Sequence, residues 1–182
     1  MSRTTVFQST TCRTCGHKPN SFFALPEHIK TRYDIGRIKR HRGFVPVGAL
    51  TAGPDEDPDQ QEGYEIALEL PDDDPDYLAG SKLFGPNVWP DELPEFQNGV
   101  YGYFESVFSL GCKLFGAFAL ALDLPKDYFD GELRKPIAQL RLLYYPRWKI
   151  KDPNPRWVLG PTPTTSVLHF MADRTWITGS EP

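Results

Sequence analysis

The sequence has no excess of positive charge, few cysteines and no long apolar run, and each shortage excludes a class of protein. Lys and Arg number 20 against 24 Asp and Glu, a net charge of −4, so we expect no nucleic-acid partner. The three cysteines, Cys12, Cys15 and Cys112, are too few for a disulfide scaffold and fit a reducing, cytoplasmic compartment. No 18 consecutive residues are apolar and the first ten form no apolar segment. We therefore expect no membrane-spanning helix, no secretory signal and no membrane partner.

The common signatures of catalysis are missing as well. GxSxG, the Walker A loop, GxGxxG and HExxH do not occur; these motifs position a nucleophile, phosphates, a dinucleotide or a zinc ion. The residues taken one by one indicate a globular domain with no identifiable catalytic residue.

Two groups of residues have the spacing of metal ligands, and neither makes a complete site. Cys12, Cys15 and His17 have the spacing of zinc and redox sites, yet a structural zinc site needs four ligands, and no second CxxC or HxxxH pair is present. We favour coincidence, with a small zinc-dependent module as the alternative. His169 and Asp173 would share a face only on a helix, and no helical pattern surrounds them. We expect no metal ligands in this chain.

The composition predicts one domain between two unusual ends. A chain of 182 residues, 40% of them hydrophobic, can bury a sizeable core. Its 18 prolines, about twice the usual ~5%, argue against a helical bundle. We expect residues 1–20 to form a poorly ordered lead-in, residues 21–146 the folded region, and residues 147–182, rich in Pro, Thr and Trp, a divergent tail.

Two segments have clear periodicity. Apolar residues mostly three and four apart predict a long helix over residues 97–122, with its N-cap at Gln97 or Asn98. Residues 137–145 alternate as a strand does. This alternation puts an apolar set on one face, Ala138, Leu140, Leu142 and Tyr144, and a mixed set on the other, Ile137, Gln139, Arg141, Leu143 and Tyr145.

The remaining elements are shorter. Residues 44–47 suit a short strand that Pro46 restricts to an edge or irregular position. Residues 62–71 suit either a short strand or an irregular half-buried segment. Residues 71–76 and 84–94, which are rich in Pro, are expected to lack regular structure.

Charge is distributed in blocks. A basic run from Lys30 to Arg42 is followed by an acidic run from Asp55 to Asp76. The basic run could bind phosphate, but blocks of opposite sign within one domain need no outside partner. We favour a solvated surface on which the two runs attract each other.

Six short segments follow one another in an order and at a spacing typical of a known family: FFALPEHIK, RHRGFVPVG, QQEGYEIALELP, GPNVWPDELPEF, ALALDLPKDYFD and LRLLYYP. Through them, residues 22–146 resemble the N-terminal half of the isopenicillin N synthase-like non-haem iron(II)/2-oxoglutarate-dependent dioxygenases. The resemblance covers about two-thirds of the chain.

The resemblance implies an α+β fold, with a helical and irregular N-terminal region before a double-stranded β-helix, or jelly roll, that is incomplete here. In the family, a His-x-Asp pair and a distant His bind iron(II), and a downstream Arg-x-Ser pair binds 2-oxoglutarate. The open metal positions support oxygen-driven hydroxylation, desaturation or ring closure of a small-molecule substrate. Tyr145 matches a family Tyr that reaches toward the co-substrate, and His41 lies near a position where some relatives use Arg to hold substrate.

The chain departs from the family where the cofactors bind. Many 2-oxoglutarate users have Asn at the position of Leu143, which weakens the expectation of co-substrate contact there. None of the four histidines, His17, His28, His41 and His169, is followed by x-Asp, and the sequence ends before the second His and the Arg-x-Ser pair would occur. We expect a truncated, inactive piece that binds neither iron(II) nor 2-oxoglutarate tightly. The alternative is a non-catalytic interaction or regulatory protein that associates with a full-length relative.

The tail suggests a reason for the missing ligands. Relatives follow the YYP strand with a segment like LGIGAHTDYE, where this chain has RWVLGPTPTTS at residues 156–166. When the codons of residues 160–166 are read from the third base of the Gly160 codon, they give the triplets NCC, NAC, NCC, NAC, NAC and NAG, in which N is any base. These triplets can encode Ala-His-Thr-Asp-Tyr-Glu. We therefore hypothesise a change of reading frame between about Pro146 and Arg156.

The nucleotide sequence across residues 146–182 tests this hypothesis. We expect its shifted frame to encode His-x-Asp and to continue into a jelly roll with a second His and an Arg-x-Ser pair. Third bases that give no His-x-Asp in that frame would contradict the hypothesis.

Overall fold

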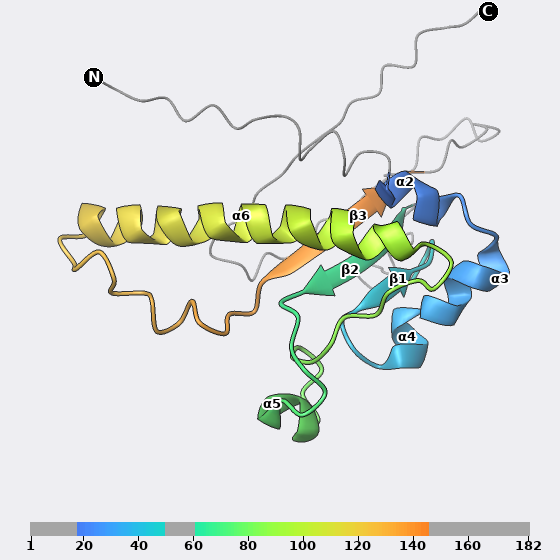
Figure 1. Ribbon diagram of the computed structural model, residues 1–182, viewed down its shortest axis with the longest axis horizontal. Coiled ribbons are helices and arrows are strands. Elements are labelled where there is room, and N and C mark those ends of the chain that lie inside the picture. The colour runs from blue at the N-terminus through green and yellow to red at the C-terminus, as the bar shows by residue number, and fades with distance from the viewer. Residues whose placement is uncertain (1–17, 50–60, 146–182) are drawn as a thin grey trace, which may run out of the picture.

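The computed structural model describes residues 18–49 and 61–145. In chain order the elements are α2 (Lys18–Phe23), α3 (Glu27–Lys30), the 3-10 turn η1 (Thr31–Tyr33), α4 (Ile35–Ile38), β1 (Gly43–Val45), β2 (Glu62–Ala67), α5 (Pro75–Leu78), α6 (Pro94–Ala121) and β3 (Gln139–Tyr144). Short helices lie at one end of a small sheet, and the long α6 passes over the sheet and beyond it (Figure 1). The described residues do not include Cys12, Cys15, His17, His169, Asp173 or the proposed frame change. The first helix, α2, begins three residues before the expected start of the folded region at residue 21.

The described strands form one antiparallel sheet in the order β1-β2-β3. The short β1 is an edge strand, as Pro46 predicted. The strand at 139–144 is confirmed within the expected range. Of the two alternatives for residues 62–71, the short strand is confirmed as β2, and every residue of this strand is buried. A central strand is covered on both faces, and its two glutamates are accommodated by cationic partners.

The long helix is confirmed, with an earlier start than expected. α6 has 28 residues and begins at Pro94, where the missing proline N–H is one that a helix leaves unpaired in any case. Gln97 and Asn98 are therefore inside the helix. Near its other end, a Cβ on Gly116 would lie 3.4 Å from the carbonyl oxygen of Lys126, so the close return of the chain explains this glycine.

α6 also bears on the expectation of no membrane-spanning helix. Within the described residues it is long and apolar enough to cross a membrane, judged by length and composition alone. The sequence argument missed it because Glu105 and Lys113 interrupt the apolar run. A mostly buried core helix passes the same test, but only 17% of the apolar window of α6 is buried. Phe96, Val100 and Phe104 place the first half of α6 in the core.

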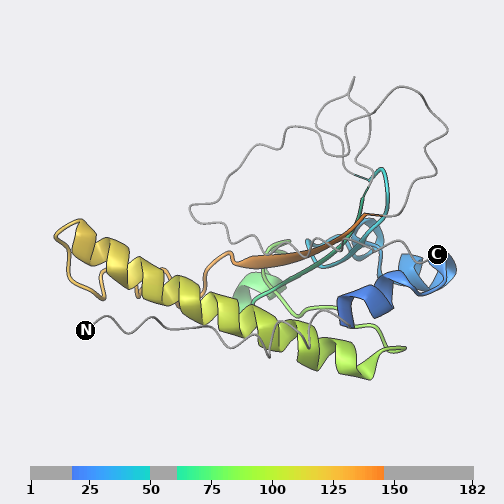
Figure 2. The same cartoon turned by 90° about the horizontal axis from the view of Figure 1, so that it is seen from above.

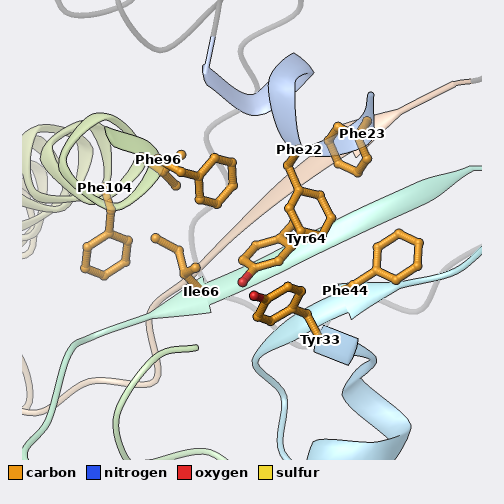
Figure 3. Close-up of a cluster of buried hydrophobic side chains, with 9 residues drawn as sticks. Phe22, Phe23, Tyr33, Phe44, Tyr64, Ile66, Phe96 and Phe104 are labelled. Atoms are coloured by element: carbon orange, nitrogen blue, oxygen red, sulfur yellow. The ribbon is translucent and has the colours of Figure 1, made fainter. Parts of the chain in front are cut away.

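An aromatic cluster joins α2, the sheet and α6 (Figure 3). Phe22, which is fully buried, lies edge-on to Tyr64 of β2 with ring centroids 4.5 Å apart. Its ring is also 5.7 Å from both Phe44 of β1 and Phe96 of α6. Aromatic contacts of this kind add roughly 0.5–1.5 kcal/mol per pair to the burial of the rings.

A buried ion pair fastens α3 to the start of β2. Lys30 is 5% exposed, and its Nζ donates to Glu62 Oε1 at 2.7 Å and lies 3.0 Å from Glu27 Oε2. Burial by itself would lower the pKa of Lys30, but the hydrogen bonds to Glu62 and Glu27 outweigh burial, and the net effect raises this pKa. The basic and acidic runs thus meet at this point as expected, though in a buried contact instead of a solvated one.

Two further ion pairs join the basic and acidic runs to residues outside them. Arg32 of the basic run donates a hydrogen bond to Glu92, and Asp74 of the acidic run accepts one from Lys135 at 2.8 Å. Asp74 also caps α5 through the amides of Asp76 and Tyr77. The segment 71–76 is therefore not wholly irregular.

Side-chain hydrogen bonds organise the segment before α6, which lacks regular structure as expected. The Asn87 amide donates to the Ala67 carbonyl at 2.8 Å and accepts from the Ala67 N–H at 2.9 Å. Glu69 accepts from the Asn87 N–H at 2.7 Å and from Trp89 Nε1 at 3.2 Å. Asn87 thus takes the place of a strand partner at the end of β2.

Substituting Lys30→Met should lower the free energy of unfolding by about 3–5 kcal/mol, because it leaves the Glu62 carboxylate buried without a partner. The double variant Lys30→Met/Glu62→Gln should lose less, and Lys82→Met, at an exposed position, should change little. Urea unfolding measures all three. A double variant as unstable as Lys30→Met would contradict this account.

The raised pKa of Lys30 determines how stability depends on pH. The contribution of the Lys30 ion pair to the free energy of unfolding is complete below about pH 10.4, the pKa of lysine in the unfolded chain. This contribution is lost as the pH rises through the higher pKa of the folded state.

Substituting Asn87→Ala should lower the free energy of unfolding by about 2–6 kcal/mol, because it leaves the buried N–H and C=O of Ala67 unpaired and each such group costs roughly 1–3 kcal/mol. Asn98→Ala, at an exposed position of α6, is the matched control and should leave the unfolding midpoint nearly unchanged. Equal midpoints for the two variants would show that Asn87 does not hold this segment.

Candidate functional site

The candidate site is the face of the sheet that points away from the aromatic cluster. Leu140 and Leu142 pack against that cluster, so the alternate residues of β3 lie on the opposite face. The register places Leu143 opposite Gly63 and Arg141 opposite Glu65. We call this the outer sheet face; its members are Gly43, Val45, Gly63, Glu65, Ala67, Gln139, Arg141 and Leu143, and Tyr145 follows in the same alternation.

A cross-strand ion pair occupies the middle of the outer sheet face. Arg141 Nη2 lies 2.6 Å from Glu65 Oε1. The Glu65 side chain is 5% exposed and that of Arg141 is 43% exposed. The carboxylate is thus buried beneath a guanidinium that solvent and ligands can reach.

A second guanidinium, that of Arg42, is buried just before β1. Arg42 is 2% exposed, and its two Nη atoms donate to the carbonyls of His41 at 2.9 Å and Leu83 at 2.7 Å. Its Nε has no hydrogen-bond partner among the described residues. Burial lowers the pKa of Arg42 and the charge of Arg40 lowers it further, against the opposing charges of Glu69 and Glu65.

The structure does not bring the two sequence-predicted site residues together. His41 is exposed and lies two residues before Gly43, which pairs with Glu65 toward the end of β2. Tyr145 directly follows Tyr144, which pairs with Glu62 at the start of β2. The two residues are therefore at opposite ends of the sheet, roughly 20 Å apart at about 3.3 Å per residue.

The described residues do not fit an iron ion. Between residues 18 and 49 and between 61 and 145, no three His, Cys, Asp or Glu side chains are grouped so that they could hold a metal. His28 and His41, the two histidines in these ranges, are both exposed. The outer sheet face can offer a ligand a guanidinium and a phenol, but not a metal centre.

Sequence reasoning placed Arg141, Leu143 and Tyr145 on one face and missed what lies beside them. The pairing of Glu65 with Arg141 depends on the register between β2 and β3, and the burial of Arg42 depends on the carbonyl of Leu83, 41 residues away. The alternation of residues 137–145 predicted which residues of this strand share a face. No local sequence pattern predicted that Glu65 and Arg42 lie near them.

Comparison with known proteins identifies the family. Residues 9–92 match the family model described as the non-haem dioxygenase in morphine synthesis N-terminal region. A 2-oxoglutarate-dependent dioxygenase of Didymella fabae is 34% identical over 146 residues, which are 78% of this chain and 42% of that protein. The 2-oxoglutarate-Fe(II) type oxidoreductase hxnY of Emericella nidulans is 31% identical, over 69% of this chain and 37% of that protein.

Solved structures show the same relationship. A 2OG-Fe(II) oxygenase family protein from Caulobacter crescentus has a TM-score of 0.68 and 30% identity, covering 81% of this chain and 46% of that one. A full-length Neurospora crassa protein, solved in complex with alpha-KG and thymine, has a TM-score of 0.60 and 25% identity, covering 79% of this chain and 44% of that one.

The chain therefore spans less than half the length of these relatives. Its helices and small antiparallel sheet confirm the expected mixture of helix and strand and cover only part of the relatives' jelly-roll fold. The matches in sequence and in structure agree that the chain belongs to the non-haem iron(II)/2-oxoglutarate-dependent dioxygenase family, of which it carries the N-terminal part.

Proposed function

We propose that this chain is the N-terminal part of an oxygenase that uses iron(II) and 2-oxoglutarate to oxidise a small molecule. The observation that carries the proposal is the combined match of sequence and structure to 2-oxoglutarate-dependent oxygenases over about four-fifths of the chain. The Neurospora crassa relative was crystallised with alpha-KG and thymine, which supports a small organic substrate. The three cysteines of this chain support a cytoplasmic location.

In this proposal Tyr145 contacts the co-substrate from the outer sheet face, beside Leu143 and the half-exposed Arg141. A substrate-holding role for His41 finds less support, because His41 lies at the other end of the sheet. The described residues contain no iron site, and no histidine of the sequence stands in a His-x-Asp pair. We therefore propose that the 182-residue chain is inactive by itself.

A non-catalytic role is the second candidate. Phe118 and Leu122, four residues apart at the end of α6 and its C-cap, are 45% and 64% exposed, and exposed apolar patches mark interaction sites. This observation favours a protein that acts by binding a dioxygenase polypeptide.

A chimera tests the proposed function, with residues 18–145 of this chain replacing the matched part of the Neurospora crassa protein. We expect the chimera to consume 2-oxoglutarate. Tyr145→Phe in the chimera should raise KM for 2-oxoglutarate about tenfold or more, because a hydrogen bond to a charged group contributes roughly 1.5–3 kcal/mol. Tyr128→Phe, at a 59% exposed position, is the matched control and should leave KM unchanged.

Two results would contradict the proposal. A folded chimera that binds iron but consumes no 2-oxoglutarate would show that this region does not serve an oxygenase. Turnover of 2-oxoglutarate by the purified 182-residue chain would show that the chain is not inactive by itself.

A further inference from the structure

The guanidinium of Arg141 is the charged group that the outer sheet face presents to solvent. Glu65, its partner, is buried, and the other members of this face are apolar or neutral. In Figure 2, α6 runs along one side of β3, and the outer sheet face is on the other side. Gln139, Arg141 and Leu143 are exposed there. A ligand can therefore reach the guanidinium without displacing a described helix.

Glu65 holds only one end of this guanidinium. The contact joins Glu65 Oε1 to Arg141 Nη2 at 2.6 Å, and it is the ion pair that the described residues give Arg141. A guanidinium has five N–H groups in a planar fork, so donors remain for a second acceptor.

The burial of Glu65 indicates a role beyond stability. Burying a carboxylate costs more free energy than an ion pair with a solvent-exposed partner normally returns. The 5% exposed Glu65 side chain does, however, fix the direction of the 43% exposed Arg141 side chain. A binding group that is held by a buried partner in this way is already oriented for its ligand.

The charges around Glu65 leave an excess of positive charge. Burial and the charge of Arg40 lower the pKa of Arg42, and the charges of Glu69 and Glu65 oppose this effect. Glu65 therefore interacts with the guanidinium of Arg42 as well as with that of Arg141. Three guanidiniums thus share two carboxylates in this group, which favours the approach of an anion.

An apolar area adjoins the guanidinium on the outer sheet face. A Cβ on Gly63 would lie 3.4 Å from Val45 Cβ and 3.8 Å from Leu143 Cδ2, so these two side chains border a position that has no side chain of its own. Leu143 follows Arg141 on the same face at a distance of about 7 Å along the strand. A ligand that fits both features combines an anionic group with an apolar body.

We propose that Arg141 binds the carboxylate of the oxygenase substrate, an organic acid whose apolar body lies over Gly63 between Val45 and Leu143. This inference rests on the proposed function and names the substrate class of that same site. Arg141 contacts the substrate, and Glu65 is a positioning residue. A carboxylate suits a guanidinium because the two can form a pair of parallel hydrogen bonds.

Titration of the full 182-residue chain with benzoate, followed by heteronuclear NMR, tests the site. Benzamide has the same apolar body without the charge, and acetate has the charge without the body. We expect benzoate to bind about fivefold or more tightly than either, because hydrogen bonds between charged groups are roughly twice as strong as neutral ones and the ring buries apolar area. Benzoate should shift the Arg141 Nε–H signal and the amide signals of Gly63 and Leu143, and 2-oxoglutarate should not displace it.

Variants separate binding from stability. Glu65→Gln/Arg141→Met leaves no unpaired carboxylate in the sheet, so it should fold and lose the preference for benzoate over benzamide. Arg141→Lys keeps the charge and loses the planar fork, so it should bind benzoate about threefold or more weakly at an unchanged midpoint of urea unfolding. Arg134→Met, at an exposed position outside β3, is the matched control and should leave the affinity for benzoate unchanged.

The other outcomes decide against the inference. Equal affinities for benzoate and benzamide overturn it, and so does a double variant that retains the preference for benzoate. Displacement of benzoate by 2-oxoglutarate would assign the guanidinium to the co-substrate and overturn it as well. An active chimera together with a chain that does not prefer benzoate would remove this inference alone. An inactive chimera together with a chain that prefers benzoate would remove the proposed function and leave the carboxylate site without a substrate role.

Discussion

The contact between Phe22 and Tyr64 is the interaction on which the other elements depend. Tyr64 is in the central strand, and its hydroxyl donates to the carbonyl of Val88 at 2.7 Å, so the strand also holds the Pro-rich segment that leads to α6. Phe22 brings α2 onto that strand and contacts Phe44 and Phe96 with the rest of its ring. Removing a buried aromatic ring of this kind costs roughly 3–5 kcal/mol, a large share of the stability of a small domain.

The same packing determines which face of the sheet is available for chemistry. Once the even-numbered residues of β2 and β3 face the aromatic cluster, the period of two sends Glu65, Arg141 and Tyr145 to the other side. A shift of register by one residue would bury these polar groups in the core and expose Tyr64. The positions of the candidate binding residues are thus a consequence of core packing, although none of them contributes to the core.

Local patterns predicted the elements that sequence spacing can encode. The long helix, the strand at 137–145 and the edge position of β1 followed from apolar periodicity and from Pro46. The burial of β2, the role of Asn87 and the separation of His41 from Tyr145 did not. Each depends on which strands pair and in what register, and such pairing joins residues 18 to 82 positions apart. The start of α6 was misplaced because proline was taken only as a helix breaker, whereas at the first turn it is a favourable residue.

Buried charge and exposed apolar surface are distributed in this chain in an unusual way. Lys30, Glu62, Glu65 and Arg42 are inside, while Leu120, Leu122 and Ile137 face outward. A self-contained domain gains stability from the opposite arrangement, because burying charges costs free energy and burying apolar side chains provides it. The interior charges are tolerated because each has a partner or a carbonyl within the described residues, whereas the outward apolar residues gain nothing until something covers them. The outer sheet face extends over β1, β2 and β3, so Arg141 lies next to the edge of β3 that has no strand partner among the described residues.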